Sequence, residues 1–135
     1  MFTATGSYIL DPVTGKLRRF SRLNIKNGNV TRDNKGNAWV HNYTGNVWYV
    51  NTSTGDIKPF QFLSSEHLGY IDVERYSIIH DSRDIIWITT YGNGLFAYDL
   101  NTGGLQHFTF EVSHSSHINS NYLQYIIEDR SGGIW

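Results

Sequence analysis

Residues 81–87 read DSRDIIW, and this pattern of an Asp, a turn and a Trp occurs twice more in the chain. Residues 33–39 read DNKGNAW and residues 129–135 read DRSGGIW, so the copies follow one another at an interval of 48 residues. A second motif begins twelve residues after the Trp, with NTSTG at 51–55 and DLNTG at 99–103. A fixed interval of this length predicts a repeat architecture.

Each repeat unit is predicted to form four short strands. In the central copy the predicted strands are residues 76–80, 85–91, 95–100 and 105–110. The turns between them are rich in Gly, Asn and Asp and are short, which makes neighbouring strands antiparallel. A four-stranded antiparallel meander that recurs every 40 to 50 residues is typical of propeller blades. We therefore predict an all-β fold that is a fragment of a β-propeller.

The pattern divides residues 1–135 into a single propeller segment of about three blade equivalents. The predicted parts are full blades at 28–60 and 76–110, the C-terminal half of a blade at 2–20 and the N-terminal half at 122–135. Propellers normally have four to eight blades, and unpaired strand edges favour pairing with another chain. We therefore expect a head-to-tail homo-oligomer in which each end completes the half-blade of the next copy, two copies giving six blades.

The residues that recur in every copy have structural roles that need no ligand. The Asp that opens the turn can accept hydrogen bonds from backbone N–H groups, a Gly can supply the positive φ, and the Trp can pack between blades. In the central copy Asp84 replaces the Gly, which is tolerable because Asp enters the left-handed region readily. These structural motif residues are Asp33, Gly36, Trp39, Asp81, Trp87, Asp129, Gly132 and Trp135.

The composition narrows the class of protein. Aromatic residues make up 15% of the chain and there are thirteen Gly, which favours strands and turns. The net charge is −1 with no run of like charge, so we expect no nucleic-acid partner. No Cys is present, and no stretch has the length of a signal peptide core or a membrane span.

Three segments of the chain resemble a known repeat. Residues 77–108 contain SIIHD, IWITTYGNGLFAYD, TG and a closing Phe in order. Residues 126–135, IIEDRSGGIW, match the first half of the same pattern, and residues 9–15, ILDPVTG, match its second half. Together these copies resemble the two-component regulator propeller repeat.

The resemblance implies a function for the chain. It implies the periplasmic sensor region of a hybrid two-component regulator, of the kind found in Bacteroides-like gut bacteria. Such regions bind oligosaccharides and signal as dimers, while a histidine kinase lies elsewhere in the parent protein. On this basis we expect a non-catalytic segment with no cofactor.

The histidine and aspartate residues give little support to a metal site or a catalytic site. His114 and His117 have the spacing of a ligand pair, but they lie in a polar loop without the third or fourth ligand that a metal needs, so no metal is expected. Asp33, Asp81 and Asp129 occupy the same place in successive turns, one per blade, rather than facing one sugar as glycosidase carboxylates do. A propeller hydrolase or lyase acting on glycans remains the alternative.

Sugar binding is expected at the loops that join the second strand to the third and the fourth strand to the next blade. These loops share one rim, where aromatic faces can stack on sugar rings and planar polar groups can bond hydroxyls. The candidate ligand-binding residues are Tyr91, Asn93, Arg75, His117 and Asn121.

Overall fold

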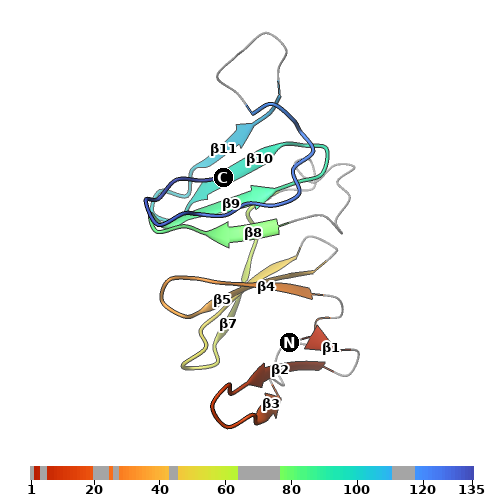
Figure 1. Ribbon diagram of the computed structural model, residues 1–135, viewed down its shortest axis with the longest axis vertical. Helices are drawn as coiled ribbons and strands as arrows, with labels where there is room; N and C mark the ends of the chain where they lie inside the picture. The colour runs from red at the N-terminus through yellow and green to blue at the C-terminus, as the bar shows by residue number, and fades with distance from the viewer. Residues whose placement is uncertain are drawn as a thin grey trace.

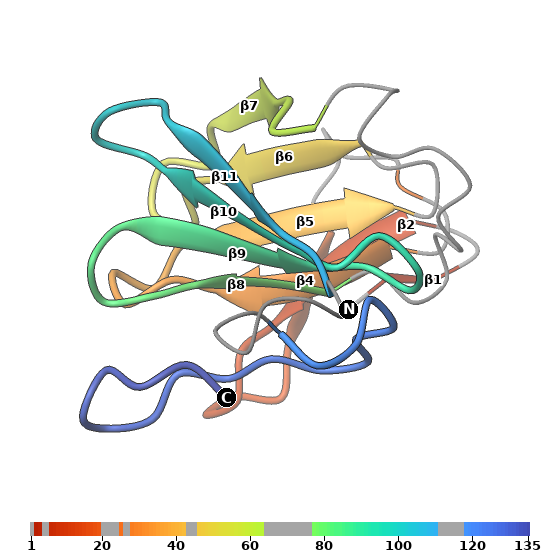
Figure 2. The same cartoon turned by 90° about the horizontal axis from the view of Figure 1, so that it is seen from above.

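The computed structural model describes residues 2–3, 6–19, 25, 28–42, 46–63, 77–110 and 118–135, and no helix occurs among them. Within these described ranges, eleven strands form three sheets (Figures 1 and 2). The first sheet contains β1 (Phe2–Thr3), β2 (Gly6–Leu10) and β3 (Leu17–Arg19). The second contains β4 (Gly28–Arg32), β5 (Ala38–Asn42), β6 (Val47–Val50) and β7 (Ile57–Phe60). The third contains β8 (Ser77–His80), β9 (Ile85–Thr89), β10 (Leu95–Asp99) and β11 (Leu105–Phe108).

The two four-stranded sheets have the predicted blade topology. In each, the strands lie in sequence order and every neighbouring pair is antiparallel. Figure 1 shows the three sheets stacked along the long axis, with β1–β3 at one end and β8–β11 toward the other. The all-β fold class with four-stranded, blade-like sheets is thereby confirmed.

The strands of the third sheet are shorter than predicted. β9 ends at Thr89, because the Thr90 backbone N–H and hydroxyl both donate to the Gly94 carbonyl and start a turn. Tyr91, expected at the end of this strand, instead forms an isolated bridge with Tyr122. β10 and β11 likewise end at Asp99 and Phe108, one and two residues before their predicted ends.

The end segments differ in how much regular structure they contain. Residues 2–19 include the three strands β1–β3. Residues 118–135 contain only isolated bridges, one of which joins Glu128 to Ile134 beside paired backbone hydrogen bonds between Ile127 and Trp135. This segment is bonded to the third sheet, because the Leu123 N–H donates to the Thr90 carbonyl. The assignment of the two ends as complementary half-blades stays a prediction.

The turn between β8 and β9 is organised by the buried carboxylate of Asp81. Its Oδ1 accepts the backbone N–H groups of Arg83 and Ile85, each at 2.9 Å, and its Oδ2 accepts the indole N–H of Trp87 at 2.9 Å. Asp84 takes a φ of 64° at the position where the other copies have Gly. The turn therefore depends on bonds to the N–H groups two and four residues after the Asp.

The same turn recurs in the other two copies. The Oδ1 of Asp33 accepts the N–H groups of Lys35 and Asn37, and the Oδ1 of Asp129 accepts those of Ser131 and Gly133. The glycines of these turns, Gly36 and Gly132, have φ values of 83° and 82°. All three turns therefore share one hydrogen-bonding scheme.

The main core lies between the second and third sheets. It contains Trp39, Val47, Phe62, Leu63, Ile78, Ile86, Ile88 and Phe96. Trp39 is 2% exposed and packs against Tyr49, Phe60 and Phe62, with ring centroids 4.8 to 5.3 Å apart. The Thr31 hydroxyl donates to the Ile78 carbonyl at 2.6 Å, which ties β4 to β8 across the same interface. Trp39 thus packs between neighbouring blades, as the repeat predicts.

The three repeat tryptophans do not share one environment. Trp39 is buried, Trp87 is only half-buried and Trp135 is 76% exposed. Trp39 belongs to the core between the second and third sheets, whereas Trp87 stacks against Phe108 in its own blade, with ring centroids 6.2 Å apart. Trp39 and Trp87 therefore hold the same place in the repeat, but only Trp39 is fully buried.

The carboxylate of Asp81 should contribute more to stability than one in an exposed turn. We expect Asp81→Ala to lower the free energy of unfolding by about 3 kcal/mol, because an unsatisfied buried donor costs roughly 1 to 3 kcal/mol. Asp99→Ala is the matched control, since Asp99 accepts the N–H groups of Asn101 and Thr102 in an exposed turn and should cost less. Urea denaturation measures both, and equal losses would contradict the argument.

Stability should also fall on mild acidification because of His41, which is 2% exposed on β5. Burial lowers the pKa of His41 from 6.5 to about 4, so below pH 6.5 the unfolded chain takes up a proton that the folded chain does not. The free energy of unfolding should fall by up to about 3 kcal/mol between pH 6.5 and pH 4. His41→Gln should flatten this slope, and an unchanged slope in that variant would refute the assignment.

Candidate functional site

The strand connections lie at two opposite ends of the sheets. We call the end that holds residues 90–94 and 118–122 the loop rim, and the end that holds the Asp turns at 33–36 and 81–84 the turn rim. Figure 2 shows the β8–β9 and β10–β11 connections together at one end of the third sheet, and the β9–β10 connection at the other. Three of the predicted sugar-binding residues, Tyr91, Asn93 and Asn121, belong to the loop rim.

The structure brings three of the five predicted ligand-binding residues together at the loop rim. Tyr91 packs edge-on against Tyr122, with ring centroids 5.1 Å apart. The Asn121 carbonyl accepts the N–H groups of Gly92 and Gly94, at 2.9 and 3.0 Å. The Asn93 carbonyl lies 2.7 Å from the His107 Nε2. The other two predicted residues, Arg75 and His117, lie outside the described residues.

The shape of the loop rim is held by close backbone packing. Gly94 has a φ of 74°, and a Cβ there would come within 2.2 Å of the Phe108 carbonyl oxygen. The Asn121 side-chain oxygen accepts the Phe110 N–H at 2.6 Å, so this amide has a structural role in addition to any contact with a ligand. The loop is therefore preformed, and the aromatic rings beside it are held in place.

Tyr122 is a functional candidate that the sequence reasoning missed. Its side chain is 63% exposed and borders the loop of Tyr91. The signal available in the sequence was a second tyrosine directly after Asn121, but residue 122 was assigned to the predicted half-blade at 122–135 rather than to this rim. An exposed aromatic ring beside polar groups is the arrangement that stacks on a sugar ring.

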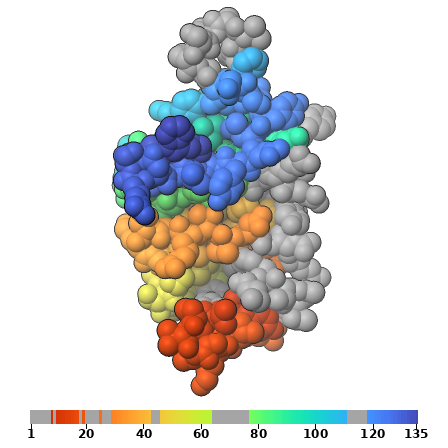
Figure 3. Space-filling model, in the orientation of Figure 1, coloured from red at the N-terminus to blue at the C-terminus, as the bar shows by residue number. Residues whose placement is uncertain are grey.

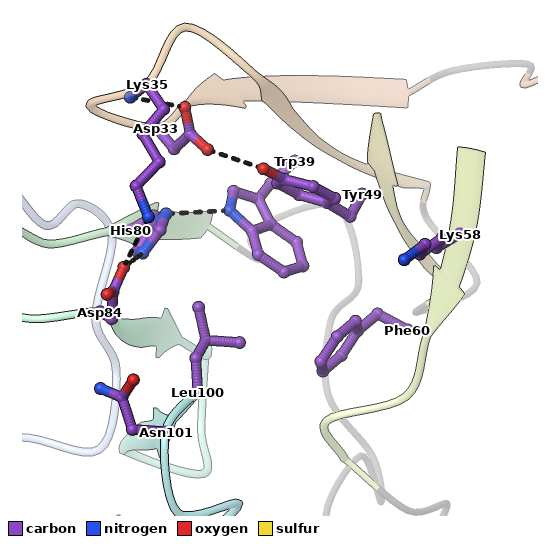
Figure 4. Close-up of a pocket in the computed structure, with 10 residues that line it drawn as sticks. All are labelled: Asp33, Lys35, Trp39, Tyr49, Lys58, Phe60, His80, Asp84, Leu100 and Asn101. Atoms are coloured by element: carbon purple, nitrogen blue, oxygen red, sulfur yellow. Dashed lines mark hydrogen bonds and ion pairs between the residues drawn. The ribbon is translucent and has the colours of Figure 1, made fainter. Parts of the chain in front are cut away.

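A second candidate site lies at the turn rim, in a cleft of about 310 Å³ between the second and third sheets. Figure 4 shows its lining: the buried edge of Trp39 at the back, Tyr49 and Phe60 on one side, and His80 and Asp84 on the other. We call it the inter-blade cleft. Its residues come from two repeats, so no single motif in the sequence indicated it.

A chain of hydrogen bonds crosses the inter-blade cleft. The Trp39 indole N–H donates to the His80 Nδ1 at 3.3 Å, which leaves the proton of a neutral His80 on Nε2. That Nε2 lies 2.9 Å from the Asp84 Oδ1, and the Lys35 ammonium lies 3.9 Å from the same oxygen. Both ring nitrogens of His80 are therefore engaged, which does not suit a general base.

The carboxylate of Asp33 is also fully engaged. Its two oxygens accept the N–H groups of Lys35 and Asn37, the Asn37 amide and the Tyr49 hydroxyl. Burial works to raise the pKa of Asp33, but these hydrogen bonds outweigh it and hold the pKa below its usual value. Burial and the bond to ionised Asp33 in turn raise the pKa of Tyr49. The carboxylate of Asp33, the hydroxyl of Tyr49 and the ring of His80 are thus all engaged within the fold.

The described part of the chain has neither a metal cluster nor a helix that could span a membrane. No group of three or more His, Cys, Asp or Glu side chains there could hold a metal ion. No helix in that part is long and apolar enough to cross a bilayer.

The structure is similar to extracellular domains of bacterial signalling proteins. Two solved structures of the extracellular domain of BT4673 from B. thetaiotaomicron, described as a putative one-component system and a putative hybrid two-component system, match with 22% and 23% identity and TM-scores of 0.65 and 0.67. Each match covers 96% of this chain and 17% of the other. The extracellular domain of the putative hybrid two-component system BT3049 from the same organism matches with 22% identity and a TM-score of 0.57, over 96% of this chain and 16% of that one.

No protein-family model and no curated protein sequence matches the chain. The chain spans less than a fifth of the length of the solved chains that it matches. At these identities the likeness concerns architecture, and the chain has the fold of part of these extracellular domains.

Proposed function

We propose that this chain is a non-catalytic, periplasmic part of a two-component sensor, and that its loop rim binds an oligosaccharide. The fold supports this proposal, because the matched domains are extracellular and belong to putative two-component or one-component systems. The histidine kinase that such a sensor controls belongs to other parts of the parent protein. The sugar-binding proposal rests on the exposed ring of Tyr122, which packs against Tyr91 beside a preformed polar loop.

The alternative is a propeller enzyme that hydrolyses or eliminates glycans. Such an enzyme needs carboxylates that are available to the substrate. The three turn carboxylates are instead saturated by their own turns, as the bonds to Asp33, Asp81 and Asp129 illustrate. This engagement favours a binding function over catalysis.

Calorimetry separates the two proposals when it is run beside an assay for product release. We expect a panel of glycan-derived oligosaccharides to contain a ligand that binds without turnover, and Tyr122→Ala to weaken its binding at least tenfold. Tyr125→Ala is the matched control, because Tyr125 is 76% exposed and lies outside the residues 90–94 and 118–122 that form the loop rim. Release of a sugar product, or equal losses in the two variants, would contradict the proposal.

The two ends of the stack are proposed to pair with further copies of the chain. Apolar side chains are exposed at both ends: Tyr125, Ile127 and Trp135 at one, Leu10 and Leu17 at the other. Figure 3 shows the C-terminal residues on the surface beside the third sheet and β2–β3 at the far end of the molecule. Exposed apolar groups beside unpaired strand edges favour head-to-tail association.

Light scattering at micromolar concentration tests this pairing. We expect the 135-residue chain to form a dimer, and Trp135→Asp to dissociate it, because a buried carboxylate at the interface would lack a partner. Val13→Asp is the control, since Val13 is 90% exposed in a turn away from the strand edges. A monomeric native chain at that concentration would refute the proposal.

A further inference from the structure

The inter-blade cleft is lined on one side by Lys58, an exposed residue. Lys58 extends from β7, and among the described residues no carboxylate pairs with its ammonium group. Figure 4 shows this ammonium directed inward, toward the space between Tyr49 and Phe60. A lysine with its stem on an aromatic wall and its charge over a cleft is positioned to meet an anion.

The carboxylates that line the cleft are already engaged by other groups. Asp33 accepts four hydrogen bonds, including the one from Tyr49. Asp84 lies between His80 and Lys35. Lys58 is therefore the charged group of the cleft that has no ionic partner among the described residues, and the Asn101 amide lies at the opposite edge as a further hydrogen-bonding group.

The apolar side chains that line the cleft determine the size and polarity of the uncharged part of the ligand. Phe60 and Leu100 are partly buried apolar side chains packed against the core, and both line the cleft. Small-molecule pockets run from about 300 to 1,000 Å³, so a cleft of about 310 Å³ suits a single ring rather than an extended chain. An apolar wall beside one free cation favours a ring that carries one negative group.

We infer that the inter-blade cleft binds a small ring-bearing carboxylate, with the carboxylate at Lys58 and the ring against Phe60 and Leu100. The site lies at the turn rim, so it is distinct from the proposed sugar site at the loop rim. Two sources share this chemistry, a uronic acid and an aromatic acid. Titration with one acid of each kind decides whether the cleft prefers a sugar ring or an aromatic ring.

The test titrates the full chain with glucuronate and with benzoate, and with glucose and benzyl alcohol as their uncharged counterparts. We expect one carboxylate to bind at least tenfold more tightly than its counterpart and to shift the indole N–H resonance of Trp39 in a proton–nitrogen NMR spectrum, leaving that of Trp135 in place. Binding should weaken with added salt, because the ammonium is near the surface. Preference for glucuronate identifies a sugar acid, and preference for benzoate an aromatic acid.

Matched variants connect the binding to the cleft. Lys58→Met keeps the unbranched stem and should weaken the binding of the preferred carboxylate at least tenfold. Lys16→Met, at an exposed turn, should leave that binding unchanged. Tyr122→Ala should also leave it unchanged, which separates this site from the loop rim. If both carboxylates bind no more tightly than their counterparts, or if Lys16→Met matches Lys58→Met, the inference is overturned.

Discussion

The packing of the Trp39 ring between two sheets sets the geometry of the rest of the molecule. A four-stranded sheet has two faces, and neither the second nor the third sheet can bury its inner face without the other. Trp39 fills the space between them and contacts rings from three positions of its own blade, Tyr49, Phe60 and Phe62. Its indole N–H also reaches His80 in the next blade, so the same side chain fixes both the core and the wall of the inter-blade cleft.

The Asp turns explain why carboxylates are frequent at the turn rim and yet unsuited to catalysis. A short turn leaves backbone N–H groups that need acceptors, and an Asp at its first position supplies them. In the turn of Asp81 the carboxylate also holds the Trp87 indole, so its two oxygens are occupied by the fold. A carboxylate used in this way has low proton affinity, since the hydrogen bonds overcome the effect of burial and keep the pKa of Asp81 below its usual value.

The repeat made the strand order and the turns predictable, because each depends on residues that lie close together in the sequence. The period of 48 residues located four strands in each blade, and the Asp84 substitution correctly indicated a positive φ in the central turn. The inter-blade cleft was not predictable in the same way. The contact between Trp39 and His80 joins residues 41 positions apart in different repeats, and only the relative placement of two sheets brings them together. Tyr122 was missed for a related reason, since its pairing with Tyr91 bridges two separate connections.

The two candidate sites share strands, and this connects them mechanically. β9 has five residues, and a strand rises about 3.3 Å per residue, so the rims lie about 16 Å apart across the sheet. The turn before β9 carries Asp84 into the inter-blade cleft, and the loop after it carries Tyr91 to the loop rim. Between them Ile86 and Ile88 are fully buried against the neighbouring blade. A ligand that moved the blades apart at one rim would therefore strain the packing of β9, and through it the loop at the other rim, because a close-packed core transmits displacement rather than absorbing it.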